Sequence, residues 1–243
     1  KSETAKKKSQ RAINDEEKAK ALQDKGGHIA LEIMFTEDVL GTTPGDKELL
    51  KDYVVQQMLE EQPRSEEEQK EEMEATTRVD HDENLDDEMR KNTTFFPRIP
   101  EDGTPFLWNY QTKGTLKEAG KAMRIATSDK FLSNYKKLVD LLIFPYPRRV
   151  PLILPEGITE TTFLERPVRA PTPQGERVFI LRSEVIPAGT TARFGISFLS
   201  TKLEKYIRKW LDYGRLHGYL QWRNGGYGTY AWRELSEGEE VTN

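Results

Sequence analysis

The stretch "HIALEIMFTEDVLG" (28–41) places an apolar residue at every second position of its first half. Side chains that alternate in this way lie on one face of a β-strand, so the stretch predicts a strand with one buried face. A Gly-Gly pair precedes it and "GTTPG" (41–45) follows it, and both sequences interrupt regular structure. The predicted inward-facing residues are Ile29, Leu31, Ile33 and Phe35.

Helices and further strands alternate along the rest of the chain. Apolar residues recur at helical spacing in 115–128, 129–144 and 200–218, and Ser128 or Asp129 is suited to cap the second helix. The segments 93–114, 148–155 and 161–199 are predicted to be extended, with a turn at 187–189. Helices interleaved with turn-linked strands indicate an α+β fold with an antiparallel sheet.

Charge is divided unevenly between the two parts of the chain. Residues 1–90 hold 14 Lys and Arg against 25 Asp and Glu, a net charge of −11, whereas 91–243 hold 23 against 16, a net charge of +7. The basic part permits a polyanionic partner although the whole chain is acidic. We expect a flexible tail at 1–25, one domain at 26–235 with an acidic helical or disordered insertion at about 52–92, and a tail at 236–243.

Several classes of function find no support in the sequence. There is no Cys, no apolar run of about 18 residues and no apolar core segment near the N-terminus, so we expect a cytoplasmic protein without membrane contact. No glycine loop has the context of a nucleotide-phosphate site, and the three His residues lack metal-ligand spacing, so no cofactor and no metal are expected. His217, near Tyr213 and Tyr219, is the candidate for a catalytic base.

Basic residues form the first candidate binding surface. Lys113, Lys117, Lys121 and Arg124 recur at spacings of four, four and three, which places them on one face of a helix. A solvated stripe without function explains this pattern equally well. Further arginines suited to bidentate phosphate contacts lie in segments predicted as loop-rich; they are Arg148, Arg149, Arg166, Arg169, Arg177 and Arg223.

The glycine-rich stretch "GYLQWRNGGYGTY" (218–230) forms the second candidate binding surface. Its aromatic side chains Trp222 and Tyr227 can stack on bases. Its glycines permit either close approach to a nucleic-acid backbone or a bulged turn whose aromatic residues pack inward. Both interpretations stay open at this level for Gly218, Gly225, Gly226 and Gly228.

The order of these features resembles the RAMP superfamily of CRISPR-associated RNA-binding proteins, including solitary members encoded by phages or prophages. The similar pieces are "HIALEIMFTEDVLGTTPG", the helix entry "YQTKGTLKEAGKAMR", the hairpin region "GERVFILRSEVIPAGTTARFGISFL" and the final "LEKYIRKWLDYGRLHGYLQWRNGGYGTY". The resemblance implies a ferredoxin-like or RRM-like sheet with helices on one face. It also implies that the entry Lys113–Gly114 and the glycine-rich loop follow a nucleic-acid strand, although this loop is more aromatic and less basic than is usual in the family.

These observations predict a non-catalytic protein that binds single-stranded nucleic acid, RNA in preference to DNA. The resemblance further implies a homo-oligomer or a subunit of a ribonucleoprotein that assembles along the strand, with a role in antiviral defence. The first alternative is a phage protein-interaction or anti-defence factor that uses its acidic segment 59–89. The second is a metal-independent endoribonuclease in which His217 acts with a tyrosine.

Overall fold

The main sheet of the computed structural model is built around the strand predicted first. The structure describes residues 26–46, 91–172, 175–236 and 239. β1 (Gly27–Phe35) lies between β11 (Tyr230–Glu234) and β10 (Thr191–Phe198), and β10 pairs in turn with β6 (Ile143–Tyr146) and β7 (Arg149–Ile153). β5 (Phe106–Trp108) extends the sheet beyond β7, and all of these pairs are antiparallel.

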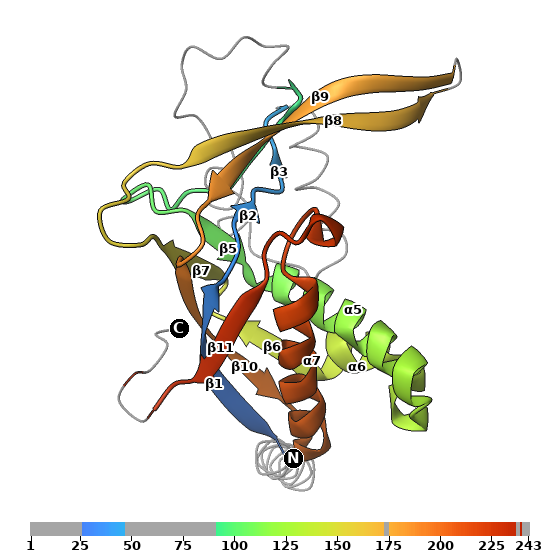
Figure 1. Ribbon diagram of the computed structural model, residues 1–243. Helices are drawn as coiled ribbons and strands as arrows, with labels where there is room; N and C mark the ends of the chain where they lie inside the picture. The colour runs from blue at the N-terminus through green and yellow to red at the C-terminus, as the bar shows by residue number, and fades with distance from the viewer. Residues whose placement is uncertain (1–25, 47–90, 173–174, 237–238, 240–243) are drawn as a thin grey trace, which may run out of the picture.

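Three α-helices lie together on one side of this sheet (Figure 1). They are α5 (Asn109–Thr127), α6 (Tyr135–Leu142) and α7 (Glu204–His217), with short 3₁₀ turns η1 (Lys130–Asn134), η2 (Thr201–Leu203) and η3 (Arg223–Gly225). α5 follows β1 and precedes β6, whereas α7 joins β10 to β11. This β-α-β-β-α-β order with the central strand order β11-β1-β10-β6/β7 is the ferredoxin-like arrangement. The predicted α+β fold with helices on one face is confirmed.

The core lies between the helices and the sheet. All four inward positions predicted for β1 are buried. The apolar residues at helical spacing in α7 are buried as well, namely Tyr206, Ile207, Trp210 and Leu211. The inward side chains of β1 and α7 therefore pack in one apolar cluster, which also includes Leu116 and Ala119 of α5. Burial of these side chains provides the main stabilisation of the domain.

A second, smaller sheet extends from the first. It contains β2 (Val39–Leu40), β3 (Thr43–Pro44), β4 (Thr93–Phe95), β8 (Thr162–Thr172) and β9 (Gly175–Ile186). β8 and β9 form a long hairpin that projects away from the helices (Figure 1). A turn at 187–189 leads from β9 into β10, as predicted, so this hairpin is an insertion between two strands of the main sheet.

Two boundaries differ from the sequence prediction. Residues 109–114, predicted as extended, form the first turns of α5, because the Gln111 side chain accepts a hydrogen bond from the Trp108 backbone N–H (2.9 Å) and caps the helix there. The helix predicted over 129–144 divides into η1 and α6, and its last two residues belong to β6. Asp129 caps η1 through Phe131 N (2.9 Å), as predicted.

Some predicted segments lie outside the described residues. They include the tail 1–25 and nearly all of the insertion at 52–92, with the acidic segment 59–89. The alternative function that depends on the acidic segment 59–89 therefore rests on residues that the structure does not describe. Within the part of the chain that the structure describes, no helix is long and apolar enough to cross a membrane.

Candidate nucleic-acid interface

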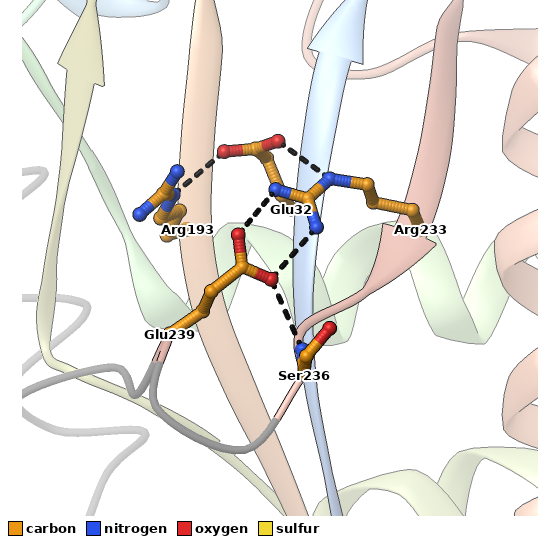
Figure 2. A network of polar contacts seen from close by, with 5 residues as sticks. All are labelled: Glu32, Arg193, Arg233, Ser236 and Glu239. Carbon is orange, nitrogen blue, oxygen red and sulfur yellow. Dashed lines mark hydrogen bonds and ion pairs between the residues drawn. The ribbon is translucent and has the colours of Figure 1, made fainter.

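The sheet face opposite the helices carries a network of paired charges (Figure 2). Glu32 on β1 accepts hydrogen bonds from Nε of Arg193 (2.6 Å) and Nε of Arg233 (2.9 Å), its neighbours on β10 and β11. The two terminal nitrogens of Arg233 donate to Glu239 (2.9 and 3.0 Å), which also accepts from the Ser236 backbone N–H (3.1 Å). Two arginines and two carboxylates therefore neutralise each other on this face.

Titration of the carboxyl groups follows from this pairing. The hydrogen bond from Arg193 holds the pKa of Glu32 below its usual value, against the opposing effect of burial. The hydrogen bonds from Arg233 lower the pKa of Glu239 to about 2.

Beside the network, the Tyr146 ring covers Gly195 so closely that a Cβ there would overlap it. RRM proteins stack bases on this face of their sheet, but here the face presents paired charges and a covered glycine.

The predicted basic stripe on α5 divides into two halves. Lys113 donates to the Asp140 backbone oxygen (3.3 Å), and burial lowers its pKa. Lys117 lies 2.6 Å from the Asp140 carboxylate. Lys121 and Arg124, in contrast, are exposed and make no ion pair with a described residue. Only the second half of the stripe therefore offers free positive charge.

Most of the arginines expected in loop-rich segments lie in strands instead: Arg149 in β7, Arg166 and Arg169 in β8, and Arg177 in β9. Their side chains are used in different ways. The guanidinium groups of Arg148 and Arg149 lie 5.6 and 5.9 Å from the ring centroids of Trp108 and Phe106. Arg169 is exposed on β8, 4.0 Å from Glu176, and Arg223 forms an ion pair with Glu118. Arg177 lies on β9, and its side chain is outside the described part of the chain.

Residues 218–229, which we call the aromatic loop, connect α7 to β11. The rings of Trp222 and Tyr227 stack with their centroids 4.9 Å apart and an interplanar angle of 12°, and the Arg166 guanidinium lies 4.5 Å from the centroid of Trp222. Trp222 nevertheless remains 43% exposed. Arg166 also donates to Gln221 (3.2 Å), whose amide donates to Ser183 (3.1 Å). The loop is thus fixed to the base of the β8–β9 hairpin while one indole stays accessible.

The glycines of the loop serve two purposes. Gly218 and Gly228 have φ values of +84° and +74°, and a Cβ at either would overlap the backbone of the other side of the turn. There the chain approaches itself, with Tyr219 N donating to Gly228 O (2.8 Å). Gly225 and Gly226 are exposed, as is Gly114 on α5. Tyr219 is buried and Trp222 points outward, so each of the two sequence-level interpretations describes part of the loop.

His217 lies in a small ionic cluster at the end of α7. Its Nε2 is 3.1 Å from a carboxylate oxygen of Glu118, the same side chain that pairs with Arg223, and its ring is 5.1 Å from that of Tyr213. Among the described residues, no three His, Asp or Glu side chains converge to hold a metal ion.

Three exposed lysines of the helical layer were missed at the sequence level. Lys202, Lys205 and Lys209 form no hydrogen bond or ion pair with a described residue. Lys202 lies in η2, and Lys205 and Lys209 lie on the polar side of α7. Their spacing of three and four residues was the signal available in the sequence, because it complements the apolar face that the sequence analysis recognised over 200–218.

No family model matches the chain, and no curated protein matches it. Among solved structures, it is similar to a chain of a Type III-B Cmr-beta complex bound to cognate target RNA, with 11% identity and a TM-score of 0.45 over 93% of this chain. It is also similar to a chain of a Type IV-B CRISPR complex, with 13% identity and a TM-score of 0.44 over 89% of this chain and 94% of that one.

The chain spans 65% of the length of the Type III-B subunit. At these identities the similarity concerns the fold alone. Both TM-scores lie below 0.5.

Proposed function

We propose that this protein binds single-stranded nucleic acid, without catalysis, through the aromatic loop and the neighbouring exposed cations of α5. The observation that carries the proposal is the exposed Trp222, held in a stack with Tyr227 and Arg166. A flat indole held in one orientation loses little conformational freedom when a base stacks against the same cluster. Such stacking contributes about 1–3 kcal/mol per base and tolerates any sequence.

Free positive charge near this stack would contact the phosphates. Arg223 of the loop pairs with Glu118, and Lys121 follows Glu118 by about one turn of α5. Arg124 lies about one turn farther along the same helix. Lys121 and Arg124 are exposed and free of ion pairs with described residues, so a strand that starts at Trp222 would meet them along α5. RNA is the first strand to test, because the sequence resembles an RNA-binding superfamily.

The test is a titration of labelled 20-nucleotide RNA and DNA strands followed by fluorescence anisotropy at several salt concentrations. Trp222→Ala should weaken binding about 5- to 100-fold, the equivalent of one lost stacking contact. Leu216→Ala is the matched control, because Leu216 is 86% exposed on α7 and its truncation removes no ring. Equal affinities of the two variants would contradict the proposal.

The cations are tested by the salt dependence. A double substitution of Lys121→Ala and Arg124→Ala should reduce the slope of log K against log salt by about 1.4, or about 0.7 for each lost phosphate contact. Lys136→Ala with Lys137→Ala removes two exposed lysines of α6 and serves as a control of equal charge. A slope that changes equally in both double variants would indicate a general effect of charge. It would contradict the proposal that Lys121 and Arg124 contact the phosphates.

Assembly along the strand is part of the proposal. If several copies bind one strand, light scattering should find complexes whose mass rises in steps of one 28.1 kDa protomer as the strand is lengthened. One copy per strand at every length would contradict this assembly and leave binding itself intact.

A further inference from the structure

A hollow of about 580 Å³ opens where α7 begins, at the opposite end of that helix from the aromatic loop. α7 has 14 residues, so the two places are about 20 Å apart along its axis. The hollow is a separate feature from the proposed strand-binding surface. Its lining residues are Phe131, Thr201, Lys202, Glu204, Lys205, Tyr206 and Arg208.

The negative groups in and beside the hollow are already engaged. Glu204 accepts a hydrogen bond from Arg208 (2.8 Å), which also pairs with Glu234. Asp129 accepts from the Tyr206 hydroxyl (2.7 Å) and from the Phe131 backbone N–H (2.9 Å). Both carboxylates of the hollow therefore have local donors.

The lysines of the hollow are not engaged in this way. Lys202 and Lys205 are exposed, and neither forms an ion pair with a described residue. Lys205 instead holds its ammonium 4.8 Å from the centroid of the Tyr206 ring. Neither ammonium group is held in a direct ion pair, although the charge of Lys205 also acts on the nearby Asp129 carboxylate. Two such groups at one hollow attract a ligand that carries concentrated negative charge, such as a phosphate group.

An aromatic wall stands next to these ammonium groups. The rings of Phe131 and Tyr206 stack with their centroids 4.8 Å apart and an interplanar angle of 10°. Tyr206 is buried, whereas Phe131 is only partly buried and lines the hollow. A flat heterocycle can stack on a partly exposed ring of this kind.

We infer that this hollow binds a nucleotide, with its phosphate at Lys202 and Lys205 and its base against Phe131. The ligand is either a free nucleoside monophosphate or the 5′-phosphorylated end of a strand, since both present the same phosphate and base. The site is distinct from the proposed strand-binding surface and does not depend on it.

Isothermal titration with AMP, adenosine and inorganic phosphate tests the site. The wild-type protein should bind AMP more tightly than it binds adenosine or phosphate. A double substitution of Lys202→Gln and Lys205→Gln should weaken AMP binding by about tenfold or more, because charge-assisted contacts are lost. Lys136→Gln with Lys137→Gln, which alters two exposed lysines outside the hollow, should leave AMP binding unchanged.

Two further variants separate the base from the phosphate and this site from the strand-binding surface. Phe131→Leu keeps an apolar side chain and should weaken AMP binding while inorganic phosphate binds as before. Trp222→Ala should leave AMP binding unchanged even where it weakens the binding of RNA. Failure of the wild-type protein to bind AMP at millimolar concentration, or equal losses in the two lysine double variants, would overturn the inference.

The source of the phosphate is identified with two RNA strands of one sequence, one with a 5′-phosphate and one with a 5′-hydroxyl. Tighter binding of the phosphorylated strand, abolished by the Lys202 and Lys205 substitutions, would assign the hollow to a strand end. Equal binding of both strands, together with AMP binding by the wild-type protein, would assign it to a free nucleotide.

Discussion

The two ends of α7 are built from similar residue types but leave different groups available to a ligand. At the C-terminal end, Arg223 is paired with Glu118, and what remains accessible is the ring of Trp222. At the N-terminal end, the carboxylates are engaged by local donors, and what remains accessible is the charge of Lys202 and Lys205. The pairing of charges, rather than their number, therefore decides which chemistry each end offers.

The largest effect is expected on stability at the C-terminal end of α7, where the loop depends on the backbone geometry of its glycines. Gly228→Ala should destabilise the protein by about 2–4 kcal/mol, because its φ is +74° and a Cβ would overlap the Tyr219 backbone. Thermal unfolding measures the change. Gly226→Ala is the matched control: its φ is also positive (+89°), but nothing lies within 4 Å of the added Cβ, so about 1 kcal/mol is expected. Equal losses of stability in the two variants would show that overlap with the Tyr219 backbone contributes nothing to the effect of Gly228→Ala.

The difference between the two ends of α7 should become smaller when Arg223 is released from its ion pair with Glu118. Glu118→Gln removes the carboxylate that holds Arg223 and should make the C-terminal end resemble the N-terminal one. Affinity for a single strand should then rise a few-fold, and the salt slope should steepen by about 0.7. Anisotropy titrations measure both quantities.

The control for this change is Glu156→Gln. It removes the same charge from an exposed residue that pairs with no described cation. The same steepening in both variants would mean that net charge, and not the release of Arg223, controls binding.

The N-terminal end should show the smallest effect, a change of stability with pH. The hydrogen bond from Tyr206 holds the pKa of Asp129 below its usual value, so this bond stabilises the folded state above about pH 4 and its contribution is lost as the pH falls further. Tyr206→Phe should therefore lower the melting temperature more at pH 7 than at pH 3.

Tyr213→Phe makes the same substitution farther along α7, at a hydroxyl that forms no hydrogen bond with a described residue. Its effect on the melting temperature should be the same at both pH values. A pH-independent effect for Tyr206→Phe as well would show that the bond to Asp129 does not contribute to stability.

Much of the fold was accessible from the sequence, because its signals are local. Alternation in β1, the apolar face of α7, the turn at 187–189 and the cap at Asp129 each depend on residues close together in the chain. The start of α5 was misplaced because its cap depends on the Gln111 side chain, which periodicity does not report. For the candidate site, the sequence supplied the residue types: the basic stripe, the loop arginines and the aromatic loop.

The sequence by itself determined the order of elements, the inward faces of its strands and helices, and the presence of cationic and stacking groups. Only the tertiary structure decided which of these groups are free. Glu118 and Arg223 meet although they are 105 positions apart, and Arg166 of β8 reaches Trp222 of the aromatic loop. Charge pairing acts over a few ångströms in space between residues that are remote in sequence, and so no local pattern reports which cations it neutralises.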